Sequence, residues 1–179
     1  MDKKAHIKDI FSAYGCDDFK WIEPQRIVVA QWVRLKCQFG CAGYGKSLSC
    51  PPNTPTVAEC RQFFKAYNTS VIFHFTKSVD KPEDRYPWSK EVNEKLLSIE
   101  RDVFLLGFYK VFVLPINECR LCPECLKKQE ACKFPKLVRP VPESMAVDLF
   151  ATARDCGYPI DVLTDYNQVM NRYALLMIE

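Results

Sequence analysis

The sequence predicts a single α/β domain over residues 1–179, with a mixed β-sheet flanked by helices and two cysteine-rich metal-binding loops. Three observations support this prediction. Segments rich in β-branched and aromatic residues alternate with segments whose apolar residues recur every three or four positions. The length of 179 residues is ordinary for one domain, and no linker or internal repeat is visible. Ten cysteines are present, and eight of them fall into two groups.

The first half of the chain predicts two helices and two strands. Residues 4–14 indicate a short helix that ends at Gly15. Residues 27–35 (IVVAQWVRL) predict a strand, because β-branched and aromatic residues dominate them. A helix over about 56–67 follows threonines that can cap it, and SVIFHFTK (70–77) predicts a second strand.

The second half predicts a long helix from Pro87 to about residue 106, whose apolar residues keep to helical spacing. The other expected elements are strands over 110–116, 160–164 and 172–179, and a helix over about 143–155. Strands separated by helices imply βαβ units with right-handed crossovers. The last two strands can pair antiparallel after Gly157, so the expected sheet is mixed.

Charge and hydropathy exclude several classes of protein. A net charge of +3 is too small to indicate nucleic-acid binding. The most apolar run, 103–116, is too short to span a membrane, and the N-terminal segment has no apolar signal-peptide core. We therefore expect a cytoplasmic protein with no nucleic-acid or membrane partner. In a reducing cytoplasm, clustered cysteines indicate metal binding rather than disulfides.

The stretch CRLCPECLKKQEAC places Cys119, Cys122, Cys125 and Cys132 at C-x2-C-x2-C-x6-C. Three cysteines at successive two-residue gaps make a tight loop that suits an iron–sulfur cubane, and bacterial ferredoxins share the first half of this run. Zinc usually takes two separated C-x2-C pairs and is the alternative here. The run predicts a 4Fe–4S cluster. Cys132 is left open, because the fourth cysteine of such runs often binds a second cluster.

The other group, which comes first in the chain and is called the first cysteine group, comprises Cys37, Cys41, Cys50 and Cys60 at the wider spacing C-x3-C-x8-C-x9-C. These gaps fit a second 4Fe–4S cluster held by a loop whose exit is stiffened by Pro51-Pro52. Cys60 also lies on the apolar stripe of its helix, where a free cysteine often serves as a small hydrophobe. If Cys60 belongs to the core, one iron keeps an open position for a substrate or a non-cysteine ligand.

Three further candidates are expected to be structural. Cys16 and Cys156 have no ligand-like neighbours in the sequence. His74 alternates with apolar residues in a predicted strand, where a histidine is more often satisfied locally than bound to metal.

Residues 40–47 (GCAGYGKS) match the phosphate-binding consensus G-x-x-x-x-G-K-[ST]. A working loop of this kind leads directly into a helix whose N-terminus faces the phosphates. Pro51-Pro52 prevents a helix starting at Lys46 from completing two turns, and no strand ends in the aspartate that usually accompanies the loop. We therefore do not expect a nucleotide ligand. Gly43 and Gly45 are better explained by backbone crowding around a metal.

Basic residues outnumber acidic ones between Cys119 and Arg139. A basic collar would raise the potential of a cluster and attract an acidic redox protein partner, but it can also simply offset the cluster's own charge. The basic residues are Arg120, Lys127, Lys128, Lys133, Lys136 and Arg139, and the acidic ones are Glu124 and Glu130.

Three stretches together resemble a known family: VRLKCQFGCAGYGKSLSCPPNTPTVAECRQFF, CRLCPECLKKQEACKFPKLVRPVPESMAVDLFATA and PIDVLTDYNQVMNRYALLMIE. The family comprises predicted cysteine-rich metal-binding proteins of unknown function from anaerobic archaea and bacteria. The resemblance implies a small cytoplasmic protein with metal, foremost iron–sulfur, at the two cysteine groups. It implies no reaction.

Three functions remain open from the sequence. The first is an electron carrier with one or two 4Fe–4S clusters. The second is an enzyme in which the cluster of Cys37, Cys41 and Cys50 binds a substrate or sulfur atom at an open iron. The third is a zinc-stabilised interaction module.

Overall fold

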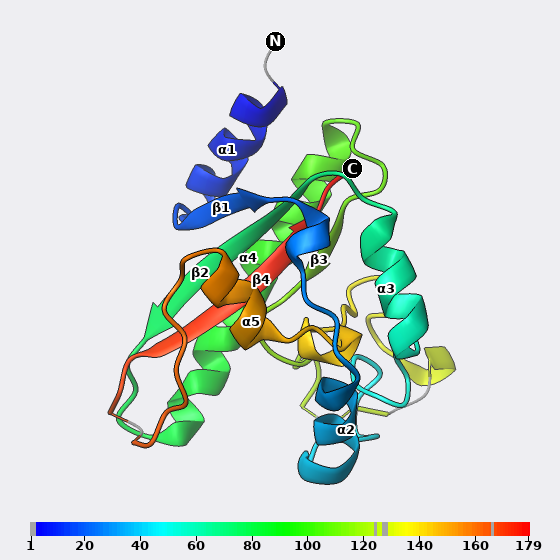
Figure 1. Cartoon of the computed structure of the whole chain (residues 1–179), viewed down its shortest axis with the longest axis vertical. Coiled ribbons are helices and arrows are strands. Elements are labelled where there is room, and N and C mark those ends of the chain that lie inside the picture. Colours follow the sequence, from blue (N-terminus) through cyan, green and yellow to red (C-terminus); the bar gives the residue numbers. More distant parts are fainter. Residues whose placement is uncertain (1–2, 124, 127–128, 166) are drawn as a thin grey trace.

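A computed structural model describes residues 3–123, 125–126, 129–165 and 167–179 of the chain. One sheet has the strand order β1-β2-β4-β3 and is flanked by helices (Figure 1). The strands are β1 (Phe19–Ile22), β2 (Ser70–Lys77), β3 (Phe112–Leu114) and β4 (Met170–Met177). The helices are α1 (Lys3–Ala13), α2 (Gln31–Gly40), α3 (Val57–Lys65), α4 (Arg85–Leu105) and α5 (Leu149–Asp155). Short 3-10 turns occur at Pro24–Arg26, Pro82–Asp84, Gln129–Ala131 and Glu143–Met145. The α/β class is confirmed.

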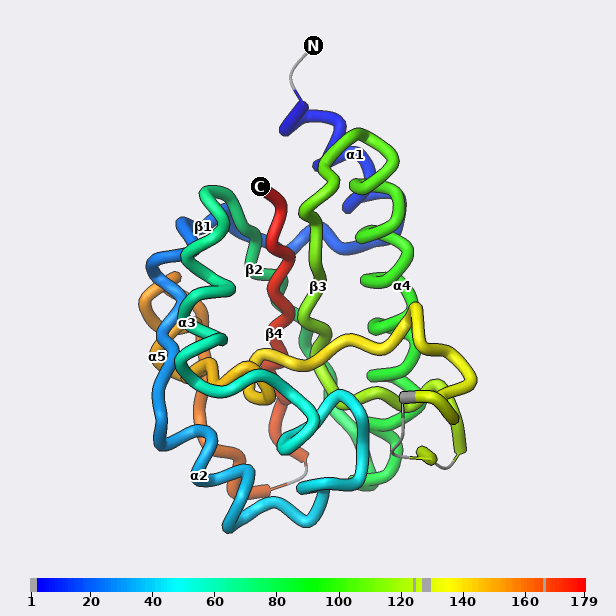
Figure 2. The backbone as a smooth tube through the Cα atoms, turned by 90° about the vertical axis from the view of Figure 1, so that its right-hand side faces the viewer, coloured from blue at the N-terminus to red at the C-terminus, as the bar shows by residue number. Residues whose placement is uncertain are grey.

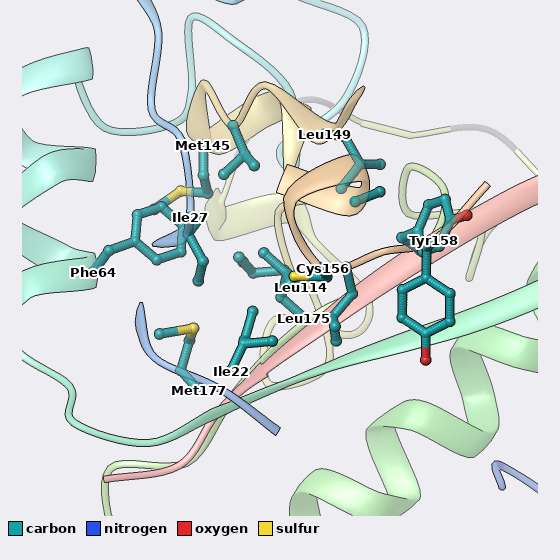
Figure 3. Close-up of a cluster of buried hydrophobic side chains, with 14 of the residues drawn as sticks. Ile22, Ile27, Phe64, Leu114, Met145, Leu149, Cys156, Tyr158, Leu175 and Met177 are labelled. Carbon is teal, nitrogen blue, oxygen red and sulfur yellow. The ribbon is translucent and has the colours of Figure 1, made fainter. Parts of the chain in front are cut away.

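The sheet separates two hydrophobic cores, because successive side chains of a strand point to opposite faces. Leu175 of β4 lies in one core with Phe64 of α3 (Figure 3). Its neighbour Leu176 lies in the other, with Phe11 of α1 and Leu96 of α4. Figure 2 shows α1 and α4 on one side of the sheet, and α3 and α5 on the other. Alternation along β4 therefore explains the three layers.

The pairing of the strands differs from the mixed sheet expected from the sequence. Every pair in the described part of the chain is antiparallel. Strands β2 and β3 run in the same direction, as their connection through α4 requires, but β4 lies between them and pairs antiparallel with both. The βαβ pattern is present, while the parallel contact that usually accompanies it is not.

The prediction of a strand at 27–35 is wrong. Only Val29 forms an isolated bridge, with Val147, and α2 begins at Gln31. The consecutive β-branched residues end at Val29, and the residues that follow form a helix in which only Val33 is buried. Local β propensity therefore favours an extended backbone for only two or three residues, not for the nine of the predicted strand.

Two more elements of the second half differ from expectation. The helix predicted at 143–155 is divided into a 3-10 turn and α5, because Ala146 adopts a left-handed conformation (φ 59°) and Asp148 caps α5 by accepting from the Ala151 N–H at 3.0 Å. The strand predicted at 160–164 is absent, and residues 161–165 are exposed without a strand partner.

The remaining predicted elements are present, and β2 has the predicted bounds. The strand predicted at 110–116 is shortened to the three residues of β3, and the bounds of the other elements shift by one or two residues. Strand β1 was not predicted from the sequence, because its four residues are too few to show an alternating pattern. The longest helix, α4, has 21 residues and buries one apolar stripe against the sheet. Within the part of the chain that the structure describes, no helix is both long and apolar enough to cross a membrane.

Candidate metal centre

The cysteine loop between β3 and α5 brings the four predicted ligands of the better-defined group around one hollow. Leu121, Leu126, Phe134 and Val138 complete the wall, together with Ser47 and Leu48 from a distant part of the chain. All four thiols are half-buried. The four cysteines that line the hollow are Cys119, Cys122, Cys125 and Cys132.

The electrostatics of this hollow show that the thiols interact with one another. Burial raises the pKa of the Cys119 thiol, and the negative charges of the other three cysteines raise that pKa further. A hydrogen bond from the backbone of Leu121 acts in the opposite direction and favours the thiolate. Without a cation, four thiolates here would repel one another. A positively charged metal centre would remove that repulsion and satisfy all four.

The first cysteine group is assembled at the end of α2 and in the loop that follows. Cys37 lies in the last turn of α2, Cys41 is its C-cap residue, and Cys50 is in the loop before α3. The negative charge of Cys41 raises the pKa of both Cys37 and Cys50, so the three thiols are close enough to interact, although burial is the larger cause for each. The Gly43 N–H donates to the Cys41 Sγ at 3.3 Å.

Cys60 occupies a different environment from the other three. It is fully buried on α3, in the core that contains Phe64 and Met145. Its thiol donates to the Pro55 carbonyl oxygen at 3.5 Å and lies 4.0 Å from the Met145 sulfur. Its pKa is raised chiefly by burial, and no other cysteine contributes to that shift. The structure therefore places Cys60 as a core side chain.

The two cysteine groups lie against each other. The backbone N–H of Cys119 donates to the Ser49 hydroxyl at 3.1 Å. Ser49 is buried, and its hydroxyl is also 3.0 Å from that of Ser47. The Ser144 hydroxyl approaches the Cys50 sulfur at 4.0 Å. These serines were not singled out from the sequence, because their role depends on contacts between segments far apart in the chain.

Residues 40–47 match the phosphate-binding consensus in sequence, but they do not have the structure of a phosphate-binding loop. The segment after Gly40 is a series of turns rather than the start of a helix, and the Lys46 side chain is exposed. Ser47, which would bind magnesium in a nucleotide site, is buried against Ser49. Gly45 has a φ of +69°, so a residue with a side chain would be strained there.

The basic collar is partly neutralised by ion pairs within the protein. The Arg139 guanidinium pairs with the buried Glu100 at 2.8 Å, and Arg120 pairs with Glu118. Lys133 and Lys136 form no ion pair within the described residues. Three members of the expected set lie outside the described residues, namely Glu124, Lys127 and Lys128.

The other candidates are structural, as expected. Cys16 and Cys156 are buried in the two cores. The His74 ring bonds Asp18 at 2.7 Å and Asn171 at 2.8 Å, and it stacks on Tyr173. Both ring nitrogens are therefore occupied within the protein.

The geometry of the centre can be compared with that of a single-ion site. Among the described residues, no three His, Cys, Asp or Glu side chains form a group that could hold one metal ion. The four thiols of the Cys119 loop instead stand around a shared hollow. The donor set of soft thiolates fits iron–sulfur or zinc, and it does not fit a hard oxygen-seeking cation.

Fold and site together define a cysteine-rich α/β protein with two cysteine-rich loops. Residues 20–178 match the model of a family described as predicted metal-binding protein, DUF2284. The chain therefore belongs to the DUF2284 family. No match was found among curated proteins or among solved structures.

Proposed function

We propose that this protein is a cytoplasmic electron carrier that binds two 4Fe–4S clusters. One cluster is assigned to Cys119, Cys122, Cys125 and Cys132, and the other to Cys37, Cys41 and Cys50. The observation that carries this proposal is the hollow lined by all four cysteines of the Cys119 loop. When bound, such clusters accept and release single electrons at potentials set by hydrogen bonds and solvent exposure.

The contact between the two loops supports a relay through both clusters. The hydrogen bond from Cys119 to Ser49 holds the loops side by side, so electrons would have a short route between the centres. The protein supplies backbone N–H groups at Gly43 and Leu121 that stabilise negative charge on sulfur. Cys41 is exposed, which would leave its cluster open to oxidants and suits an anaerobic setting.

A groove next to the Cys119 loop supports docking of a redox protein. Its volume is about 970 Å³, and it is lined by the exposed side chains of Phe104, Tyr109 and Leu137 together with Lys136. Two residues, Leu121 and Phe134, line both this groove and the hollow of the cysteines. An apolar surface with a basic rim suits a partner with an acidic rim, and docking there would bring it next to the cluster.

The proposal predicts the metal content of protein purified without oxygen. Two clusters would give about eight iron atoms and eight acid-labile sulfides per chain, and a brown solution. Iron, sulfide and zinc are measured on the same sample. A colourless sample with stoichiometric zinc and no sulfide would overturn the proposal in favour of a zinc-stabilised interaction module.

The burial of Cys60 favours a second candidate function, an enzyme with an open iron position at the first cluster. With Cys60 in the core, only Cys37, Cys41 and Cys50 remain to bind that cluster, and one iron has no cysteine ligand. A cluster with an open position can bind a substrate directly, which an electron carrier does not require.

Substitution of Cys60 tests this assignment. Cys60→Ala is expected to retain about eight iron atoms per chain, because the side chain contacts Pro55 and Met145 rather than a metal. The matched variant Cys50→Ala is expected to lose about four. Iron content is measured for both variants after confirming by circular dichroism that they are folded. Equal iron loss in the two variants would make Cys60 a ligand and remove the open position.

A further inference from the structure

A cavity of about 510 Å³ lies beside the first cysteine group, bounded by α2, α5, the segment 160–163 and the start of β4. Cys37 and Cys41 form part of its wall. Its volume is within the range of about 300–1,000 Å³ typical of small-molecule sites. Nothing in the proposed electron transfer requires this cavity.

Most of the cavity wall is apolar. Side chains from four different segments converge on it, so the shape depends on the complete fold rather than on one loop. A ligand with an apolar body would therefore displace poorly bound water from this wall. The apolar residues include Val33, Val147, Leu149, Phe150, Ile160 and Tyr173.

Three of the charged residues on the wall are already engaged within the protein. Asp148 caps α5. Asp161 forms an ion pair with Arg154 at 3.6 Å, and the Lys36 ammonium lies over the Trp32 ring at 5.2 Å. Because these three groups already have partners within the protein, we do not assign them a role in binding a ligand.

Arg172 differs from them. It is half-buried on the cavity wall, and its side chain forms no hydrogen bond or ion pair within the described residues. Burial raises the pKa of Glu143, which also lines the cavity, and the positive charge of Arg172 acts in the opposite direction. The two side chains form no ion pair within the described residues. A free guanidinium presents a planar set of donors that suits a carboxylate.

We propose that this cavity binds a small organic carboxylate with an apolar body. The carboxylate pairs with Arg172, the body packs against the apolar wall, and the far end faces Cys37 and Cys41. This inference rests on the proposed function in one respect: the ligand acts as a substrate only if those cysteines hold a cluster. Binding of the carboxylate itself depends on Arg172 and the cavity.

The test uses 3-phenylpropionate as the probe and 3-phenylpropan-1-ol as its uncharged analogue, with the full chain purified anaerobically. We expect the carboxylate to bind at least about tenfold more tightly than the alcohol, because a charge-assisted hydrogen bond accounts for that factor. Arg172→Gln is expected to weaken binding of the carboxylate by about tenfold and leave binding of the alcohol unchanged. Affinities are measured by isothermal titration calorimetry.

Arg101→Gln is the matched control, because Arg101 is an exposed arginine that pairs with Asp102 on α4 and does not line the cavity. It should bind both probes as the original protein does. Failure of the original protein to bind either probe, equal binding of both, or equal weakening in the two variants would overturn the inference. Iron content, measured on the same samples, separates this failure from a failure of the proposed cluster.

Discussion

Replacing Cys122 and Cys125 together by alanine is expected to lower the iron content from about eight to about four atoms per chain. Two of the four thiols around the hollow would be lost, so the cluster assigned to this loop could not be held. The cluster assigned to Cys37, Cys41 and Cys50 would remain, because these three cysteines come from other segments. Iron and sulfide assays and the visible spectrum of the anaerobic protein provide the measurement.

The control for this experiment is Cys156→Ala, which removes a cysteine buried in the core rather than at either loop. It should retain the full iron content while losing some stability. If the double variant also retains about eight iron atoms, the Cys119 loop does not bind a cluster. Circular dichroism on each variant separates loss of metal from loss of the fold.

Arg139→Met is expected to lower the free energy of unfolding by about 3–5 kcal/mol, because it leaves the buried Glu100 carboxylate without its cation. The pair is 2.8 Å apart, and the Glu100 side chain is 8% exposed. Glu100 also accepts from the Val113 N–H at 2.9 Å, so the pair connects the end of the cysteine loop to both α4 and β3. At this chain length the melting temperature should fall by roughly 6–20 °C in thermal denaturation.

Two variants show whether the burial of the pair is the cause. Arg26→Met removes one partner of the exposed pair with Asp155, and it should lower the melting temperature much less than Arg139→Met does, because solvent screens an exposed pair. The double variant Glu100→Gln with Arg139→Met should recover part of the loss, because glutamine keeps an acceptor for Val113 without the buried charge. A melting temperature for Arg139→Met no lower than that of Arg26→Met would contradict the prediction.

The sequence was a good guide to the fold where local pattern and final environment agree. Strand β2 was predicted with the bounds that the structure has, because its β-branched and aromatic residues all suit a buried strand. The prediction of a strand at 27–35 was wrong because Val28 and Val29 favour a strand, whereas the residues that follow form α2. The placement of β4 between β2 and β3 could not be inferred, since it depends on contacts between distant segments.

Some residues of the candidate site could likewise be predicted from the sequence, and others could not. Cysteine spacing singled out all seven cysteines that we propose as ligands, because short gaps in the chain favour short distances in a loop. The sequence left open whether Cys60 is a ligand or a core side chain, and its contact with Met145 supports the proposal that it is a core side chain. Ser49 and Arg172 carried no recognisable signal, because each acquires its role from segments far away in the sequence.

The central position of β4 has a consequence for the order of events during synthesis. This strand is the last in chain order, yet its alternate residues complete both hydrophobic cores. Neither face of the sheet can close until Met170–Met177 has left the ribosome. Both cysteine loops are synthesised before β4, so their thiols are present before the sheet is complete. Any metal that these loops bind would therefore enter a completed site only after β4 has joined the sheet.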